Sequence, residues 1–275
     1  MKHIRIATAI LLIAVLLVSS ALASELTEYN GPAWTFGVNL AELNENLLRV
    51  VDADSPLTAE DVPSKLVTLK TRHNNEAGAN DNGGIYKASN AKIQLCETAE
   101  LALVSMFAAA ENQGVILYVR QGYRSYEDMA KRYEAAVAKG NTAGVAKPGQ
   151  SDYQTGMAAT VVGKEWRTKE LTSEFSASTE SQWLQQNAAR FGFIIPQSAE
   201  PWHVRYVGAT VALYMSANNM DLASFKQALT TAKEEFTSIG GDFDAAMASM
   251  VLPEGAVILD EVGPDGDHEI TIFHD

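Results

Sequence analysis

The chain has 275 residues and a formal net charge of −13, because 34 Asp and Glu residues outnumber 21 Lys and Arg residues. A surface this acidic repels phosphate backbones, which excludes the basic footprint typical of nucleic-acid-binding proteins. The length suits one domain of ordinary size with an appendage. Cys96 is the only cysteine, so no intramolecular disulfide can form and stability must come from a packed core.

The N-terminus has the pattern of a secretory signal peptide. Lys2 and Arg5 precede an apolar run over 6–18, and small residues stand at 21–23. The run is shorter than the roughly 20 residues that a spanning helix needs, although an uncleaved N-terminal anchor is an alternative. Ser24 rather than a cysteine follows, so no lipoprotein anchor is expected, and no later segment approaches a membrane span. We therefore expect a secreted or cell-envelope protein after removal of the signal.

The first predicted elements follow a long irregular stretch. Residues 24 to about 90 contain Gly, Asn and Pro clusters around short apolar pieces, which is typical of a wrapping segment. Apolar residues then recur with helical spacing over 91–112, and Gly114 supplies a stop. Cys96 lies within this pattern and is interpreted as a buried small hydrophobe. The alternative, a nucleophile, has little support because Lys92 is the only cation within a helical turn.

Strands and helices alternate from there to about residue 220. An apolar, β-branched run over 115–119 predicts a buried strand, and Ser125 can cap a helix that runs to about Ala138. Further strands are expected at 156–162, 192–195 and 202–206, and further helices at 179–190 and 207–217. This interleaving indicates a compact α+β fold in which a small sheet holds the functional motifs.

The C-terminal part has a different pattern. The apolar residues from Leu222 to Phe236 form one amphipathic helical face. Two strand-like runs, 256–259 and 269–273, then flank the turn sequence Gly-Pro-Asp-Gly at 263–266. The chain is therefore predicted to comprise a signal peptide at 1–23, a main domain at 24–220, and a C-terminal helix and hairpin extension at 221–275.

Three motifs resemble those of one enzyme family. They are Gly-Tyr-Arg-Ser at 122–125, Ser-Asp-Tyr-Gln-Thr-Gly-Met-Ala-Ala-Thr at 151–160, and Glu-Pro-Trp-His at 200–203. The last two resemble the Ser-x-His-x-x-Gly-x-Ala-x-Asp and Glu-x-x-His motifs of the D-alanyl-D-alanine carboxypeptidases of the vancomycin-resistance type. The likeness covers roughly 48–229, and motifs in this order and spacing are hard to obtain by chance. It implies an α+β fold with a small central antiparallel sheet flanked by helices, and a zinc enzyme that removes a terminal D-Ala from peptidoglycan peptides.

The same resemblance implies where zinc should bind and identifies a changed ligand set. In the family, the His and Asp of the first motif and the His of the second hold the metal; the corresponding residues here are Tyr153, Thr160 and His203. A catalytic zinc site needs three protein ligands, an open position for water and a general base. A Tyr phenolate is costly to form because its pKa is about 10, and a Thr hydroxyl is neutral. No cofactor is therefore expected, and zinc is expected only if the protein is active.

Neighbouring residues offer little replacement for the lost ligands. Asp152 adjoins Tyr153, but successive side chains on a strand face opposite ways, so we expect Asp152 to point out of the site. The spacing supports none of the other acidic or imidazole side chains that could fold inward, which are Asp128, Glu165 and His73.

The remaining motif residues are candidates for substrate binding and proton transfer. The resemblance implies that Glu200 is the general base and that Arg124 binds the carboxylate end of the substrate, a task suited to the forked guanidinium. Ser151 is retained and could also touch the ligand. The alternatives are a structural ion pair for Arg124, and a structural strand entry for 200–203 with Trp202 in the core. Further departures from the family are Gln121 in place of Ser, Met129 in place of Gln, and a short loop at 196–199.

Three hypotheses follow from the changed ligand set. The first is a secreted carboxypeptidase-like protein that binds peptidoglycan stem peptides, or a cell-wall protein, without cleaving them. The second is an active metallo-D,D-carboxypeptidase or peptidase with an atypical metal site. The third is a purely structural use of the fold, with the acidic surface and the hairpin as an interaction module. The loss of two metal ligands favours the first hypothesis over the second.

Overall fold

The computed structural model describes residues 30–39, 42–43, 46–70, 85–88, 92–250, 257–262 and 268–273. The predicted signal peptide at 1–23 and the predicted turn at 263–266 lie outside the described residues. The chain divides into two units, one of Gly37–Leu229 and one formed by Met1–Phe36 with Thr230–Asp275. The domain boundary expected between residues 220 and 221 stays a prediction.

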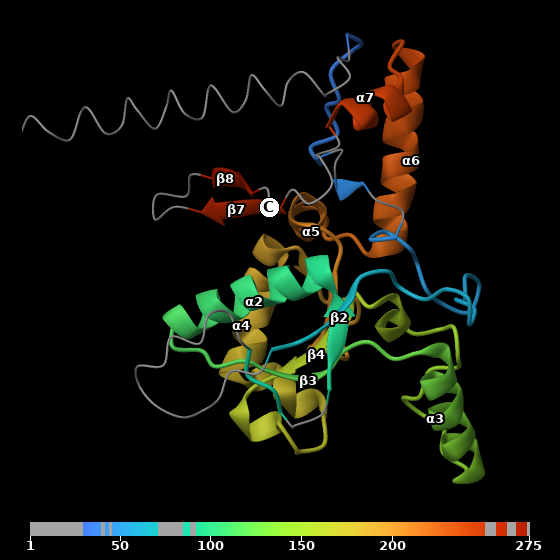
Figure 1. The fold of residues 1–275 in the computed structure, drawn as a ribbon, viewed down its shortest axis with the longest axis vertical. Coiled ribbons are helices and arrows are strands. Elements are labelled where there is room, and N and C mark those ends of the chain that lie inside the picture. Colours follow the sequence, from blue (N-terminus) through green and yellow to red (C-terminus); the bar gives the residue numbers. More distant parts are fainter. Residues whose placement is uncertain are drawn as a thin grey trace, which may run out of the picture. The chain divides into compact units, whose positions relative to one another are not determined.

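The centre of the larger unit is a four-stranded antiparallel sheet (Figure 1). Its strands lie in the order β3 (Tyr118–Gln121), β4 (Ala158–Val162), β6 (His203–Tyr206) and β5 (Phe193–Ile194). A separate antiparallel pair is formed by β1 (Leu66–Thr68) and β2 (Gln94–Cys96). The expected small antiparallel sheet is therefore confirmed.

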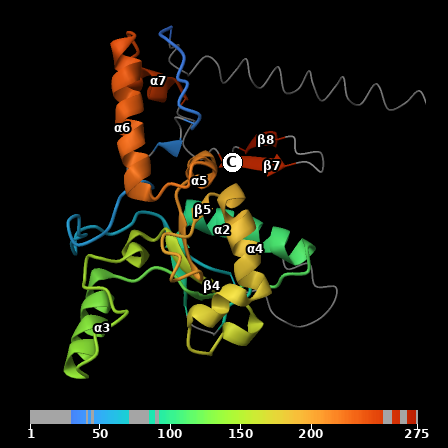
Figure 2. The ribbon, with the colours of Figure 1, turned by 180° about the vertical axis from the view of Figure 1, so that it is seen from behind.

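Among the described residues, four α-helices and four 3-10 helices lie between Leu66 and Ala217, around the strands. The α-helices are α2 (Glu97–Asn112), α3 (Tyr126–Ala138), α4 (Thr179–Asn187) and α5 (Ala209–Ala217). The 3-10 helices are η2 (Asp152–Thr155), η3 (Lys164–Trp166), η4 (Ser173–Ala177) and η5 (Ala188–Phe191). Ser125 caps α3 as predicted, because its Oγ accepts a hydrogen bond of 3.2 Å from the backbone amide of Asp128. Figures 1 and 2 show α3 projecting away from the sheet.

The two faces of the sheet have different neighbours. One face packs into the main core with α2 and α4, through side chains that include Val119, Ala159, Val161, Val204, Leu103, Met106 and Leu184. Because side chains alternate along a strand, Thr160 lies on the other face. A second buried cluster on that side contains Tyr118, Val162, Trp166 and Phe175. The motif residues of the central strands therefore lie on the face turned away from the main core.

Two predicted boundaries were wrong for local reasons. The strand predicted at 156–162 begins only at Ala158, because the residues before it form η2, which ends at Gly156 with φ of 71°. The helix predicted from residue 91 begins at Glu97, because 94–96 pair with β1 instead. Apolar periodicity alone does not separate a short strand from the helix that follows it.

Two other elements were shifted. The strand predicted at 115–119 runs over Tyr118–Gln121, so it reaches the Gly-Tyr-Arg-Ser motif. The helix predicted at 179–190 ends at Asn187 and continues as η5.

Gly156 and Cys96 fix the turn that precedes β4. A Cβ atom on Gly156 would lie 2.7 Å from Cys96 Sγ, which is shorter than the contacts that Cβ atoms make in proteins. Cys96 is buried, and burial raises the pKa of its thiol to about 11. These properties agree with the interpretation of Cys96 as a packed hydrophobe.

The smaller unit contains the predicted C-terminal helix and hairpin. Helix α6 (Leu222–Ser238) spans the division between the units, and α7 (Phe243–Met250) follows it. The indole of Trp34 makes edge contacts with Phe236 and Phe243, with 5.3 Å between ring centroids in both cases. Strands β7 (Val257–Val262) and β8 (His268–Phe273) pair antiparallel. Within the described part of the chain, no helix is long and apolar enough to cross a bilayer.

Candidate functional site

The site is built on a row of side chains that crosses three strands. Gln121 of β3 pairs with Thr160 of β4, and Thr160 pairs in turn with His203 of β6. Residues directly opposite each other in antiparallel strands point to the same face of the sheet. The register of β3 shifts just before Gln121, at a bulge after Val119. The sheet therefore brings together, on one face, Thr160 and His203 of two motifs and Gln121, which immediately precedes the third.

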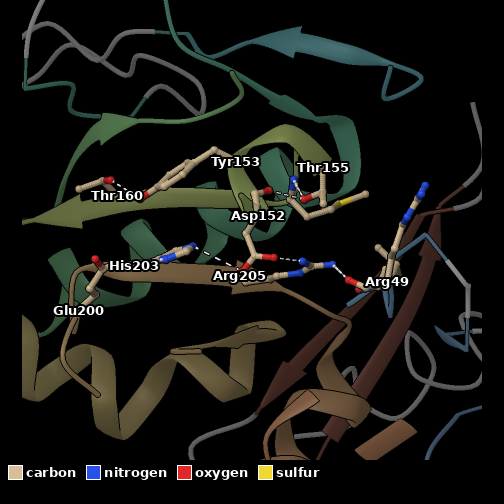
Figure 3. A network of polar contacts seen from close by, with 10 residues as sticks. Arg49, Asp152, Tyr153, Thr155, Thr160, Glu200, His203 and Arg205 are labelled. Atoms are coloured by element: carbon tan, nitrogen blue, oxygen red, sulfur yellow. Dashed lines mark hydrogen bonds and ion pairs between the residues drawn. The ribbon is translucent and has the colours of Figure 1, made fainter. Parts of the chain in front are cut away.

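Tyr153 lies over this row and bonds to it. Its Oη is 2.6 Å from Thr160 Oγ1, and its ring stacks on the His203 imidazole with centroids 4.9 Å apart and an interplanar angle of 14° (Figure 3). Burial raises the pKa of Tyr153 far above its ordinary value, so the phenol stays protonated. The two residues at the family's metal-ligand positions thus form a neutral hydrogen-bonded pair.

Asp152 points into the site, contrary to the prediction. The prediction assumed a strand, whereas Asp152 begins the 3-10 helix η2. One carboxylate oxygen accepts a hydrogen bond from Arg205 Nη1, and the other lies 3.8 Å from His203 Nε2 (Figure 3). Arg205 is 1% exposed and also donates to the backbone oxygens of Leu47 and Arg49, at 3.2 and 2.8 Å. Asp152 therefore neutralises a buried guanidinium.

Sequence reasoning missed Arg205. It lies two residues after His203, inside the stretch that the family resemblance covers, and the one signal in the sequence was a charged residue in a predicted strand, 202–206.

His203 has a carboxylate near each ring nitrogen. Its Nδ1 is 3.5 Å from Glu200 Oε2, while Asp152 faces Nε2. The contact with His203 lowers the pKa of Glu200, which is only partly buried and so remains ionised. His203 is 7% exposed, and its Nε2 has no hydrogen-bond partner among the described residues. Trp202, which lies between Glu200 and His203 in the sequence, is partly buried and packs edge-on against Phe175.

Arg124 follows β3 and is held at the same place. Its backbone amide donates to the Tyr153 carbonyl at 3.1 Å, and its Nη2 donates to Gln121 Oε1 at 2.6 Å. Its Nε is buried with no partner in the described part of the chain. Ion pairs of the described residues do not include Arg124, so the structural ion pair has no support there. Ser151 is buried next to η2.

The other candidate metal ligands do not gather at the site. Glu165 is exposed in η3, Asp128 lies in the first turn of α3, and His73 lies outside the described residues. Over the ranges that the structure describes, no group of three or more His, Cys, Asp or Glu side chains could hold a metal ion.

A groove of about 590 Å³ is lined in part by residues that neighbour the site residues in sequence. It is lined by Pro56, Leu57, Thr58, Ala59, Glu60, Tyr126, Tyr133, Lys147, Pro148 and Gln150. Gln150 immediately precedes Ser151, and Tyr126 follows Arg124 by two residues. The backbone amide of Leu57 donates to the carbonyl of Gly149 at 2.8 Å, which ties the two walls together.

Known proteins resemble this chain over most of the larger unit. The family model described as "VanY: D-alanyl-D-alanine carboxypeptidase" matches residues 92–209. "Putative carboxypeptidase YodJ" of Bacillus subtilis (strain 168) is 30% identical over 203 residues, which cover 69% of this chain and 70% of that protein. A D-alanyl-D-alanine carboxypeptidase of Enterococcus faecium is 25% identical over 209 residues, covering 72% of this chain and 62% of that protein.

Solved structures support the same family. The LdcB LD-carboxypeptidase, whose structure is described as revealing the molecular basis of peptidoglycan recognition, aligns with a TM-score of 0.55 and 26% sequence identity. The alignment covers 74% of this chain and 94% of that chain. Motifs, fold and relatives agree, and the chain belongs to the VanY family of D-alanyl-D-alanine carboxypeptidases.

Proposed function

We propose that this protein is an extracytoplasmic member of the family that binds D-Ala-terminated peptidoglycan stem peptides and does not hydrolyse them. The observation that carries the proposal is the hydrogen bond of 2.6 Å between Tyr153 Oη and Thr160 Oγ1. It occupies the positions at which the family resemblance implies two zinc ligands. The predicted signal peptide and the peptidoglycan-related relatives support a location in the cell envelope or outside the cell.

The side chains present do not fit a catalytic zinc site. Such a site takes three protein ligands, usually imidazole, carboxylate or thiolate, with an open position for water. A phenol that burial keeps protonated and a Thr hydroxyl are both neutral, so His203 is the one family ligand that remains. The carboxylate of Asp152 lies near His203 Nε2, but its ion pair with Arg205 would place a guanidinium beside a dication.

Glu200 occupies the position of the family's general base, but the metal-bound water on which that base acts needs the zinc ligands that are replaced here. A carboxylate near an imidazole can accept a proton, but in zinc peptidase chemistry the attacking water is one whose pKa a bound metal has lowered. In the absence of that water, the contact between Glu200 and His203 Nδ1 at 3.5 Å orients the imidazole against the Tyr153 ring.

The binding half of the proposal rests on Arg124. Its buried Nε–H has no acceptor in the described part of the chain, and an unsatisfied buried donor costs about 1–3 kcal/mol. A carboxylate at the end of a peptide would satisfy it with a charge-assisted hydrogen bond. Ser151 follows Gln150, one of the residues that line the groove, and this groove offers space for the rest of the peptide.

Metal analysis of four purified proteins tests the proposal. They are the parent, His203→Ala, the ligand-restoring double variant Tyr153→His with Thr160→Asp, and the matched double variant Tyr153→Phe with Thr160→Val. After dialysis against zinc, we expect stoichiometric metal only in the ligand-restoring protein. Zinc in the parent that disappears in His203→Ala, together with release of D-Ala from acetyl-L-Lys-D-Ala-D-Ala, would establish the alternative, an active metallo-D,D-carboxypeptidase with an atypical site.

Peptide binding decides the other half. The parent should bind acetyl-L-Lys-D-Ala-D-Ala in a calorimetric titration, and Arg124→Ala should bind at least ~10-fold more weakly, since a hydrogen bond to a charged group contributes about 1.5–3 kcal/mol. A parent that is folded, free of zinc and unable to bind this peptide would contradict the proposed function. It would point to a cell-wall protein partner or a structural role instead.

A further inference from the structure

Arg124 is held by a neutral acceptor. Its Nη2 donates to the side-chain oxygen of Gln121 at 2.6 Å, and this is the one side-chain hydrogen bond of Arg124 in the described part of the chain. The family resemblance gives Ser at position 121, whose side chain ends in a hydroxyl on Cβ, whereas the Gln side chain extends to a terminal amide. The longer Gln side chain therefore brings an acceptor to the guanidinium.

The sheet fixes where this acceptor lies. Gln121 is the last residue of β3, directly after the bulge, and it pairs with Thr160 across β4. Thr160 in turn is bonded to Tyr153, whose carbonyl accepts from the Arg124 backbone amide at 3.1 Å. Gln121 thus pairs with Thr160, and Arg124 is hydrogen-bonded through its backbone to Tyr153. The side chain that holds the guanidinium is that of Gln121, and the links to Tyr153 and Thr160 are made by the backbone.

A neutral acceptor orients the guanidinium without cancelling its charge. Burial is the main influence on the pKa of Arg124 and lowers it, and the nearby positive charge of Arg132 lowers it further, while Tyr153 and Asp128 raise it. Burial of an unpaired cation is costly, and a ligand anion would offset that cost. A carboxylate at position 121 would instead pair with Arg124 internally and remove the attraction for a ligand.

We infer that Gln121 is a positioning residue that fixes Arg124 for a ligand's free terminal carboxylate, so that the site selects the acid form of a D-Ala-terminated peptide over its C-terminal amide. This inference rests on the proposed function, since it specifies how the same site recognises its ligand. Gln121 bonds to one Nη and leaves the buried Nε–H without an acceptor in the described residues. The ligand carboxylate then approaches a guanidinium that is already oriented, which lowers the entropy cost of binding.

The test compares two ligands and four proteins. The ligands are acetyl-L-Lys-D-Ala-D-Ala and its C-terminal amide, and the measured quantity is the ratio of their dissociation constants. The proteins are the parent, Gln121→Met, which keeps the length but lacks the acceptor, Gln121→Glu, which adds a charge, and Gln186→Glu. Gln186 is exposed on α4, so Gln186→Glu controls for the added negative charge. Thermal unfolding midpoints establish that each protein is folded.

We expect the parent to prefer the acid. Gln121→Met should lose about 10-fold in affinity for the acid, because the guanidinium loses the hydrogen bond that orients it. Gln121→Glu should lose about 100-fold, because its carboxylate pairs with Arg124 and cancels the charge that the ligand carboxylate would meet. Neither should change binding of the amide by more than about 2-fold, and Gln186→Glu should behave like the parent. A merely structural role of Gln121 would weaken both ligands equally and leave the ratio unchanged.

Two different results would overturn the inference and can be told apart. If the parent prefers the acid and both Gln121 variants keep that preference, the positioning role is wrong while the proposed function stands. If the parent binds neither ligand, the proposed function fails and the inference fails with it. If Gln121→Glu does not fold, the ratio for Gln121→Met decides alone.

Discussion

A double-mutant cycle on Tyr153 and Thr160 measures the coupling energy of the hydrogen bond between the two residues that replace metal ligands. The two changes are Tyr153→Phe and Thr160→Val. Phe keeps the ring that stacks on His203 at 4.9 Å, and Val keeps the shape of Thr, so each change removes little besides one hydroxyl. Each single change leaves one buried hydroxyl without its partner, because Thr160 is 4% exposed and Tyr153 is desolvated.

The expected magnitudes follow from that burial. Each single variant should lower the free energy of unfolding by about 1–2 kcal/mol, which is the usual cost of an unsatisfied buried polar group. The double variant should lose less than the sum of the two, with a coupling energy of about 1 kcal/mol. The measurement is urea unfolding monitored by near-ultraviolet circular dichroism.

A control cycle makes the result decisive. Tyr133 lies on α3 and lines the groove rather than the site, so Tyr133→Phe with Thr160→Val should be additive within about 0.5 kcal/mol. Additivity of Tyr153→Phe with Thr160→Val to the same degree would refute the hydrogen bond and, with it, the account of how the metal positions are filled.

Two further predictions concern the fold around the site. Gly156→Ala should lower the free energy of unfolding by about 2 kcal/mol more than Gly114→Ala, as measured by thermal or urea unfolding. Both positions have positive φ, but only at Gly156 would the new Cβ lie 2.7 Å from Cys96 Sγ. Equal losses in the two variants would contradict the close packing of Gly156 against Cys96. A hydrogen bond from the Thr58 backbone lowers the pKa of the Asp61 carboxyl from its ordinary value of 3.8 to about 2. The contribution of Asp61 to stability is therefore present above pH 4 and is lost as the pH falls towards 2. Between pH 5 and pH 2, Asp61→Asn should therefore lose less stability than the parent, by up to about 1 kcal/mol because the carboxylate is partly exposed. An equal loss in both proteins would contradict the lowered pKa of Asp61.

The sequence predicted the parts of the fold that depend on local pattern. The apolar repeat of α2, the cap at Ser125 and the hairpin runs of β7 and β8 each follow from residues close together in the chain. These features were predictable because side-chain alternation and helical spacing have fixed periods. That the residues around 124, 153 and 203 share one site was implied by the family resemblance rather than by local pattern.

Other parts of the site depend on contacts that local pattern does not encode. Asp152 was expected to face away because the residues around it were assigned to a strand, whereas a 3-10 helix turns its carboxylate towards Arg205, 53 residues away in the chain. The bond between Gln121 and Arg124 was not predicted either, and Gln121 stands directly after a bulge in β3. Register and bulges are set by pairing partners distant in sequence, which a single sequence does not reveal.

The central claim, peptide binding without hydrolysis, is tested most directly by proton NMR of acetyl-L-Lys-D-Ala-D-Ala mixed with the protein in zinc-supplemented buffer. Binding broadens the D-Ala methyl signals of the peptide, and hydrolysis creates the separate methyl signal of free alanine in the same spectrum. We predict broadening that is weaker with Arg124→Ala, and no free alanine beyond the amount formed without protein. Accumulation of free alanine that stops with His203→Ala would contradict the account.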